Sequence, residues 1–193
     1  MNFMYWKKLL KWPSKSKLDK SNFKFIEGCL TNIRTKAIED LDLDYDWRTD
    51  SILCALDATV PINISLNHFI EQEKDELKYP LPWSEKLAIE TKNGHHIGNC
   101  MYYDIDIING EAEVGIMIGD KNYWGNGYGT DALKTLVNYI FNFTHIKRLY
   151  LHTLTTNKRA QNSFKKAGFS KVKELRKQGM NFVLMDINKL PSQ

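Results

Sequence analysis

The chain of 193 residues is 42% hydrophobic and 26% charged, a composition that supports one folded core and excludes a largely disordered protein. Its uncharged stretches are far shorter than the roughly 18 apolar residues that span a bilayer, so stable membrane insertion is excluded. The formal net charge is +4.

Positive charge is concentrated at the start of the chain. Residues 1–21 contain six lysines and one aspartate, a net charge of +5 against +4 overall, so the remaining residues sum to −1. We therefore predict a basic N-terminal extension, residues 1–21, followed by a single domain over residues 22–193. Aromatic residues between the lysines leave a weak membrane-surface or nucleic-acid contact open as an alternative for the extension. For the protein as a whole, no nucleic-acid partner is expected.

The cysteines and the N-terminal pattern bear on localisation. Lysines interrupt every apolar run near the start, so no signal-peptide hydrophobic region is visible. Cys29, Cys54 and Cys100 are odd in number and form no CxxC pair, which argues against a disulfide framework and against a zinc site. We expect buried or half-buried free thiols, a cytoplasmic protein and no bound metal.

The first predicted elements are short. Residues 23–37 alternate roughly in polarity and predict one or two strands. A short helix is predicted over residues 38–50 and a second over residues 65–77, where Ser65 is the capping residue and apolar positions recur at helical spacing. Two prolines within residues 79–83 exclude a continuing helix.

Two Asn-Gly pairs predict a three-stranded antiparallel meander. Asn93-Gly94 and Asn109-Gly110 each separate β-type runs, and this dipeptide supplies the positive φ angles of tight hairpins. The strands are expected at residues 86–91, 96–107 and 111–118.

The second half of the chain contains the clearest helix. Apolar residues recur there at spacings of three and four, the pattern of one buried helix face: Leu133, Leu136, Val137, Ile140 and Phe141. A strand is then expected over residues 148–155, a helix over 157–167 and two strands within 169–187. This order predicts an α/β (α+β) fold, with a mixed, mainly antiparallel central sheet and helices on both faces.

The segment before that helix is rich in glycine. Gly125, Gly127 and Gly129 stand at alternate positions, and their missing Cβ atoms let backbone N–H groups converge on a ligand. The following helix adds unpaired amide donors and the positive end of its dipole. Together these features predict a binding site for a pyrophosphate.

Other interpretations of the glycines are weaker but distinct. The glycines alone would also fit a merely tight strand-to-helix connection. A dinucleotide-binding fingerprint requires G-x-G-x-x-G early in a βαβ unit, and the ATP-type phosphate loop requires Gly-Lys-Ser/Thr at its end. Neither pattern is present here.

Two motifs resemble a known family. Residues 124–129 are similar to the acetyl-CoA pyrophosphate loop of the GNAT N-acyltransferase superfamily, Arg/Gln-x-x-Gly-x-Gly/Ala, except that Trp124 replaces the Arg or Gln. A Trp at this position resembles the subgroup of ribosomal-protein N-terminal (Rim-type) and polyamine acetyltransferases. Residues 157–169 resemble the family segment Asn-x-x-Ala/Ser-x-x-x-Tyr-x-Lys-x-Gly-Phe. The resemblance is specific over residues 111–169.

The resemblance implies acetyl-CoA as cosubstrate and assigns residues to its parts. The pantetheine arm would contact backbone groups of Met117, Ile118 and Gly119, with Asn157 on the other side. The pyrophosphate would be held by Trp124, Gly125, Asn126, Gly127, Tyr128, Gly129 and Thr130.

Acyl transfer to an amine requires the amine to be neutral, so a base is expected. His152 lies five residues before Asn157, where some relatives place a catalytic carboxylate, and Glu113 lies on the preceding strand. A structural role is the alternative for each. Many relatives protonate the leaving thiolate with a Tyr, but Phe164 stands at that position; Ser163, Tyr128 or water could replace it.

The acceptor is predicted less specifically. Six acidic residues within residues 39–50, which the resemblance places at the acceptor groove, could attract a cationic amine; a solvated acidic face is the alternative. His95 and His96 are expected to be exposed strand residues rather than metal ligands.

The leading functional hypothesis is an N-acetyltransferase that acts on a primary amine. The preferred acceptor in this hypothesis is the N-terminal amine of a protein or peptide. The alternatives are a small-molecule acetyltransferase for polyamines, amino sugars or aminoglycosides, and a catalytically weak CoA-binding module. A homodimer is compatible with each hypothesis.

Overall fold

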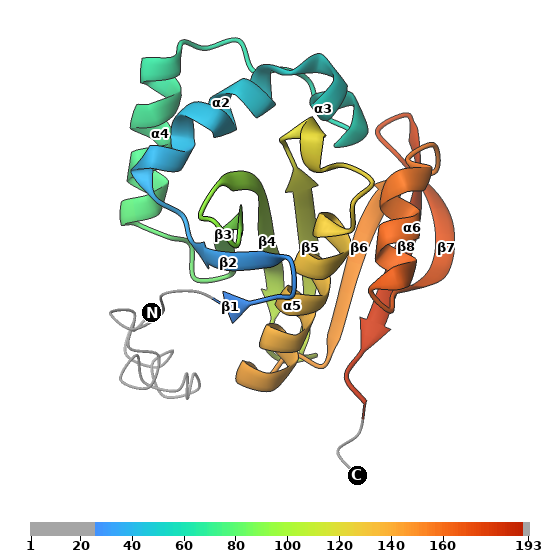
Figure 1. Ribbon diagram of the computed structural model, residues 1–193. Coiled ribbons are helices and arrows are strands. Elements are labelled where there is room, and N and C mark those ends of the chain that lie inside the picture. Colours follow the sequence, from blue (N-terminus) through green and yellow to red (C-terminus); the bar gives the residue numbers. More distant parts are fainter. Residues whose placement is uncertain (1–25, 191–193) are drawn as a thin grey trace, which may run out of the picture.

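Eight strands form one sheet in the order β1-β2-β3-β4-β5-β6-β8-β7 (Figure 1). The computed structural model describes residues 26–190, so the predicted extension lies outside the described residues. All neighbouring strands are antiparallel except the parallel pair β5 and β6, which confirms the mixed, mainly antiparallel sheet. The strands are β1 (Ile26–Glu27), β2 (Thr31–Thr35), β3 (Ser84–Thr91), β4 (His96–Asp106), β5 (Glu111–Ile118), β6 (Arg148–Leu154), β7 (Ser170–Lys177) and β8 (Met180–Asn188).

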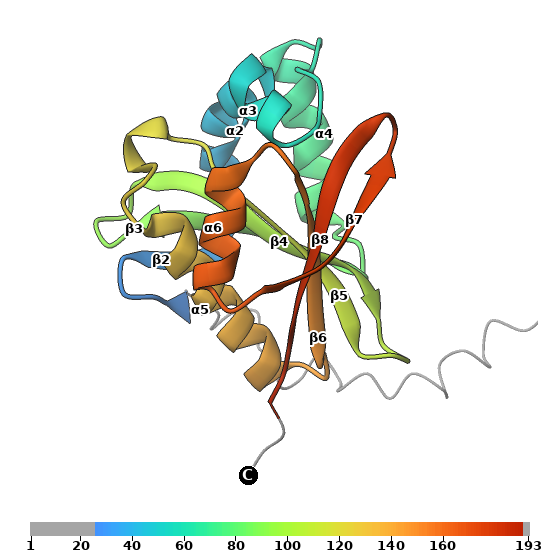
Figure 2. The same cartoon turned by 90° about the vertical axis from the view of Figure 1, so that its right-hand side faces the viewer.

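The helices fall into two groups. Helices α5 and α6 lie on one face of the sheet, whereas α2, α3 and α4 gather at the end where β5 finishes (Figures 1 and 2). None of the helices within residues 26–190 has both the length and the apolar character needed to cross a membrane. The helices are η1 (Ile38–Asp40), α2 (Leu41–Thr49), α3 (Ser51–Leu56), α4 (Leu66–Lys78), η2 (Lys121–Tyr123), α5 (Tyr128–Phe143) and α6 (Lys158–Lys166).

Burial along the strands shows which parts of the sheet are covered. Residues 87–89 of β3 and 96–98 of β4 are buried without interruption, so both faces are covered there. In β6, buried Leu149 and Leu151 alternate with half-buried residues. One face of β6 is therefore less covered, and polar side chains can project from it.

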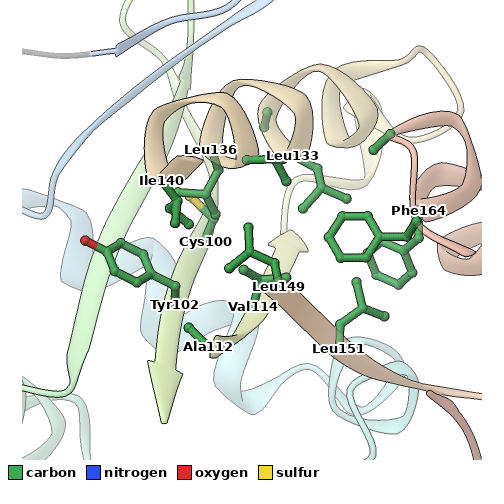
Figure 3. Packing of buried hydrophobic residues seen from close by; sticks show 14 of the residues in the cluster. Cys100, Tyr102, Ala112, Val114, Leu133, Leu136, Ile140, Leu149, Leu151 and Phe164 are labelled. Carbon is green, nitrogen blue, oxygen red and sulfur yellow. The ribbon is translucent and has the colours of Figure 1, made fainter. Parts of the chain in front are cut away.

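Helix α5 supplies much of the core. Leu133, Leu136 and Ile140 have no exposed surface, as the predicted apolar stripe requires. They lie over side chains from the sheet (Figure 3), among them Cys100, Val114 and Leu149. Replacing a Leu in such a position by Ala typically costs about 2–5 kcal/mol of stability, so this helix is held firmly against β4, β5 and β6.

The parallel pairing of β5 with β6 is short. Residues 111–113 pair with residues 148–150, and no further pairs follow. Both strands nevertheless continue, β5 to Ile118 and β6 to Leu154. The strands therefore separate in the direction of α3, which leaves a gap in the sheet at that end.

The helix predicted over residues 38–50 is confirmed in its bounds as a 3-10 turn followed by α2, but a further helix after it was not predicted. A 3-10 turn precedes α2, and Asp50 ends α2 with an extended backbone, ψ 116°. Its carboxylate accepts hydrogen bonds from the N–H groups of Ile52 and Leu53, each 2.9 Å. Asp50 thus caps a further helix, α3, which begins a new direction.

The two hairpin turns occur where the Asn-Gly pairs predict them. The positive φ angles belong to Gly94 (80°) and Gly110 (69°) alone, not to Asn93 or Asn109. Glycine therefore supplies the left-handed residue of each turn, and the asparagines keep ordinary backbone angles.

The three cysteines differ in exposure. Cys54 and Cys100 are buried, whereas Cys29 is exposed, so the prediction of buried or half-buried thiols is wrong for Cys29. Burial raises the pKa of the Cys100 thiol to about 12, which keeps this thiol protonated and unreactive.

Candidate active site

A cleft lies beside the free end of β5, with α3, the glycine-rich loop and α6 as its walls. Its volume is about 270 Å³. Most of the residues that the sequence assigns to acetyl-CoA line this cleft: Met117, Ile118, Trp124, Gly125, Gly127, Gly129, Thr130 and Asn157. Five further lining residues carry charges or hydroxyl groups and were not assigned to binding: Asp57, Tyr123, Arg159, Ser163 and Lys166.

The glycine-rich loop requires its glycines. Gly125 and Gly127 have φ angles of 78° and 90°, and Gly127 is the N-cap of α5; side chains other than glycine rarely adopt this conformation. The first helical hydrogen bond is donated by the N–H of Asp131 to the carbonyl of Gly127, 2.9 Å. Within the described chain no acceptor is found for the N–H groups of residues 128–130, so these donors can receive an anion.

The start of α5 also contacts α6. The hydroxyls of Thr130 and Ser163 lie 2.8 Å apart. A Cβ on Gly129 would lie 3.4 Å from Ile118 and 3.7 Å from Ser163. An added Cβ would make only ordinary van der Waals contacts here, so Gly129 is not required by close packing or by its backbone conformation.

Asp131 fixes the loop from behind. Its carboxylate accepts hydrogen bonds from the N–H groups of Cys29, Leu30 and Thr31, each 2.9 Å, and from the Thr31 hydroxyl. Burial opposes its ionisation, but these hydrogen bonds outweigh burial and lower the pKa of Asp131. The negative charge in the first turn of α5 is therefore satisfied away from the cleft.

Trp124 anchors the loop to β5. Its indole N–H donates to the carbonyl of Ile118 at 2.7 Å. The Arg159 guanidinium lies over its ring, 3.3 Å from the centroid, a cation–π contact. Partial burial lowers the pKa of Arg159 from its ordinary value, yet an arginine stays cationic. Arg159 and Lys166 thus add positive charge to one wall of the cleft.

Asn157 joins two walls of the cleft. Its side-chain oxygen caps α6 by accepting from the N–H of Ala160, 3.1 Å, and its amide donates to the carbonyl of Leu56 at the end of α3, 3.2 Å. Asn157 is 9% exposed. Asn157 is thus the N-cap of α6, and it positions α6 against α3.

Three residues of the predicted cofactor set do not line the cleft. Gly119 donates its N–H to the carbonyl of Ile97, 2.9 Å, so this group is already used. The Asn126 amide lies 3.4 Å from the carbonyl of Asn122. Tyr128 packs edge-on against another tyrosine ring at 4.9 Å. We therefore leave the side chains of Asn126 and Tyr128 and the Gly119 amide out of the binding site proposed below.

The two predicted bases lie together. His152 Nδ1 is 2.8 Å from Glu113 Oε1, and both side chains are mostly buried. The pairing of β5 and β6 ends at Glu113 on β5 and at Tyr150 on β6, two residues before His152. The pair therefore lies where the strands separate, although neither residue lines the cleft itself.

Further polar groups surround this pair. Tyr103 pairs with Glu113 across β4 and β5; burial and the nearby Glu113 charge raise the pKa of Tyr103 well above its ordinary value. Asp57 lines the cleft, and its negative charge also contributes to the raised pKa of Tyr103. Surrounding protein atoms desolvate this carboxylate and raise the pKa of Asp57, against a smaller opposite effect of Arg48, although part of the Asp57 surface remains exposed.

A buried phenylalanine, Phe164, stands where many relatives have the general-acid Tyr. Phe164 is 7% exposed and contacts the ring of Phe169 at 6.3 Å. Of the proposed substitutes, Ser163 lines the cleft and Tyr128 does not. Ser163 is thus the side-chain hydroxyl better placed for this role.

The acidic segment over residues 39–50 is largely structural. Glu39, Asp42 and Asp46 are exposed. The other three acids form ion pairs: Asp40 with Arg34, Asp44 with Lys36, and Asp50 with Lys121. Within the described part of the chain, only three of the six carboxylates are therefore free of a counter-ion and could attract a cationic acceptor.

The prediction that His96 is exposed is wrong. Its side chain is 6% exposed, and its two ring nitrogens face Asp44 Oδ1 at 3.3 Å and the carbonyl of Ile89 at 3.2 Å. His95 is exposed, as predicted, but it lies in the turn before β4. In the part of the chain that the structure describes, no group of three His, Cys, Asp or Glu side chains is arranged to hold a metal.

Comparisons with known proteins agree with this geometry. The family model of the acetyltransferase (GNAT) domain matches residues 34–170. An uncharacterised N-acetyltransferase, p20, from Bacillus licheniformis is 26% identical over 118 residues, which cover 61% of this chain and 66% of p20, just under two thirds.

Solved structures share the fold. The spermidine N-acetyltransferase of Vibrio cholerae, crystallised with CoA and spermine, superposes with a TM-score of 0.73 at 18% identity, over 82% of this chain and 95% of that one. The aminoglycoside acetyltransferase AAC(6')-Ib, in complex with coenzyme A, gives a TM-score of 0.68 at 20% identity, over the same shares of the two chains. At these identities the likeness concerns the fold.

Proposed function

This chain belongs to the GNAT acetyltransferase family, whose cosubstrate is acetyl-CoA, and we propose that it transfers the acetyl group to a primary amine with Glu113 and His152 as the base. The first candidate acceptor is the N-terminal amine of a peptide or protein. The observation that carries the proposal is the 2.8 Å contact between these two side chains at the point where β5 and β6 separate.

The cleft suits the cosubstrate. The unpaired N–H groups of residues 128–130 and the dipole of α5 favour a pyrophosphate, and Arg159 and Lys166 supply positive charge to the same wall. The free edge of β5 at Met117 and Ile118 leaves room for the pantetheine arm. When bound, acetyl-CoA supplies a thioester carbonyl carbon for attack by a neutral amine.

The hydrogen bond between His152 and Glu113 has only one possible donor. A carboxylate can only accept, so His152 donates its Nδ1–H to Glu113, and Nε2 keeps its lone pair. Nε2 then removes a proton from the incoming ammonium group, while Glu113 stabilises the imidazolium that forms. Base assistance of this kind contributes roughly 10²- to 10⁴-fold to the rate.

The residues around Glu113 and His152 favour an acceptor that arrives as a cation. Glu113 and Asp57 contribute negative charge, and the rings of Tyr103 and Tyr150 are close to this region, the latter 6.1 Å from the imidazole of His152. Carboxylates and aromatic faces both attract ammonium groups. A neutral amino sugar gains less from such a site than a charged amine.

A polyamine is the second candidate acceptor. The same acidic and aromatic surroundings suit it, and the V. cholerae neighbour of similar fold is a spermidine acetyltransferase. A polyamine carries amines with a pKa near 10, whereas an N-terminal amine has a pKa of about 8. Polyamine transfer therefore depends more strongly on His152 at neutral pH.

A panel of amines tests the proposal. The protein is incubated with acetyl-CoA and, separately, a peptide with a free N-terminus, the same peptide with a blocked N-terminus, spermidine and an aminoglycoside, and products are measured by mass spectrometry. We expect His152→Gln and Glu113→Gln to lower kcat roughly 10²- to 10⁴-fold. His145→Gln, in the exposed connection before β6, is the matched control and keeps the parent rate.

Two results would count against the proposal. If acetyl-CoA binds but no amine in the panel releases CoA, the chain is a CoA-binding module. If His152→Gln and His145→Gln are equally active, the base is elsewhere.

A further inference from the structure

We propose that Lys177 is itself an acetyl acceptor, so that the enzyme modifies its own chain at this residue. The inference rests on the proposed function, because it uses the same base and the same cosubstrate. Lys177 Nζ lies 3.3 Å from His152 Nε2. This is the ring nitrogen that the proposed mechanism assigns to the acceptor amine.

The contact has only one consistent arrangement of protons. His152 Nδ1 is occupied by Glu113 at 2.8 Å and must carry the hydrogen. Nε2 therefore accepts, and the Lys177 ammonium donates. An ammonium group that donates to the free nitrogen of an imidazole–carboxylate pair is the encounter that precedes proton removal.

The fold brings Lys177 to this place from a distant strand. Lys177 is the last residue of β7 and pairs with Met180 across the hairpin turn, where Gln178 and Gly179 have φ angles of 48° and 80°. The hairpin of β7 and β8 extends beyond the end of β6 toward the level of α3 and α4 (Figure 2). Its tip thereby reaches the side of the sheet on which His152 lies.

Lys177 differs from Lys171 of the same strand. Lys171 forms an ion pair with Glu174 at 2.6 Å. Within residues 26–190, Lys177 has no carboxylate partner, and its hydrogen-bond contact is with His152. Its ammonium group is therefore held at the base rather than at a counter-ion.

The reaction balances without a further reagent. The Lys177 ammonium gives one proton to His152 Nε2, and the neutral amine forms a C–N bond with the acetyl carbonyl carbon. The C–S bond breaks and CoA leaves as the thiolate. The second amine proton goes to the thiolate, and the proton on His152 returns to solvent. The products are Nε-acetyl-Lys177, CoA thiol and one proton.

The modification would change the site that produces it. Acetylation removes the positive charge of Lys177 and its ability to occupy Nε2 as an ammonium donor. An external amine no longer competes with this side chain for the base. Self-acetylation is thus expected to increase the apparent affinity for the acceptor.

The first test uses the full chain with acetyl-CoA and no added amine. Peptide mapping by mass spectrometry is expected to find one acetyl group on Lys177, formed faster than on Lys171 or Lys173 and at a first-order rate that does not depend on protein concentration. Lys177→Arg abolishes this signal, Lys171→Arg preserves it, and His152→Gln slows it roughly 10²- to 10⁴-fold.

The second test needs no cosubstrate. Diethyl pyrocarbonate modifies unprotonated imidazole nitrogens, and Lys177 covers Nε2 of His152. Lys177→Met is therefore expected to increase the rate of His152 modification several-fold, whereas Lys171→Met leaves it unchanged. Equal rates in the parent and both variants would overturn the contact on which the inference depends.

The outcomes separate the two proposals. Acetylation of an external amine without modification of Lys177 overturns the inference and leaves the proposed function intact. Equal acetylation of Lys171, Lys173 and Lys177, insensitive to His152→Gln, is uncatalysed chemistry and also overturns it. Failure of acetyl-CoA to bind overturns the proposed function, and the inference with it.

Discussion

The hydroxyl of Thr31 donates a hydrogen bond of 2.7 Å to the carboxylate of Asp131, although the two residues lie 100 positions apart in the sequence. The same carboxylate accepts from three consecutive N–H groups of the turn between β1 and β2. Asp131 is in the first turn of α5, next to the glycine-rich loop. The start of the sheet and the anion-binding end of α5 therefore form one rigid unit.

Replacing Asp131 by Asn is expected to loosen this unit. An amide has one accepting oxygen and no charge, so it cannot accept all of these hydrogen bonds, and a hydrogen bond to a charged group typically contributes about 1.5–3 kcal/mol. Urea denaturation would measure the loss of unfolding free energy. Asp75→Asn makes the same chemical change on the exposed surface of α4 and should stay within about 0.5 kcal/mol of the parent. Equal effects of the two variants would contradict the role of Asp131.

Gly127→Val is expected to remove cofactor binding. The φ of 90° is strained for Val, and the side chain would enter the loop. Acetyl-CoA at 100 times its Kd should stabilise the parent by about 2.7 kcal/mol, measured as an increase in Tm. Gly94→Val carries similar backbone strain at φ 80° in a turn where an added Cβ meets nothing within 4 Å. Only the Gly94 variant should keep the increase on adding acetyl-CoA.

Arg159→Leu is expected to weaken the cofactor site without changing the base. The variant loses a positive charge of the cleft wall and the stacking on Trp124; exposed cation–π contacts alone contribute about 0.5–1 kcal/mol. The KM for acetyl-CoA should increase while kcat stays near the parent value. Lys158→Leu removes the same charge from α6 at a residue outside the cleft and serves as the control. A kcat effect as large as the KM effect would place Arg159 in the chemistry instead.

The buried group around Asp44 should make stability depend on pH. Burial works against ionisation of Asp44, but hydrogen bonds from His96 and Asn99 and the charge of Lys36 outweigh it, so its pKa is lowered in the folded state. A lowered folded pKa means that this stabilisation is complete above the unfolded pKa of about 3.9 and is lost as the pH falls through the folded value.

Asp44→Ala tests this dependence. The variant leaves Lys36 buried without its counter-ion, which typically costs about 3–5 kcal/mol. In urea titrations the difference from the parent should be constant near pH 7 and should shrink at acidic pH. A difference that does not change with pH would mean that Asp44 is not ionised in the fold.

Most elements of the fold could be predicted because their signals are local. The apolar stripe of α5, the Asn-Gly turns and the cap at Asn157 depend on neighbouring residues alone. Helix α3 was not predicted, because its 6 residues are too few to show a helical repeat of apolar positions. The exposure of His96 was also missed, since its burial depends on Asp44 from a helix more than fifty residues away.

The sequence allowed the individual candidate residues of the site to be selected, but not the contacts between them. The glycines and the two proposed bases were selected from the sequence, but nothing in the sequence states that Glu113 and His152 touch. The register of β5 on β4 shifts between Tyr103 and Asp106, so counting outward from the turn does not place Tyr103 opposite Glu113. Lys177 reaches His152 from a strand that is not adjacent to β6, an approach that depends on how the terminal hairpin extends.

The brevity of the β5–β6 pairing has a bearing on how a ligand enters. Past Glu113 and Tyr150 the two strands share no main-chain hydrogen bonds, so an arm inserted between them displaces no sheet contact of the protein. Such a guest meets exposed donors and acceptors along β5 and can be accommodated as though it were a missing strand. Its residence is then governed by the grip of the loop on the phosphates, and the sheet itself need not open and close with each turnover.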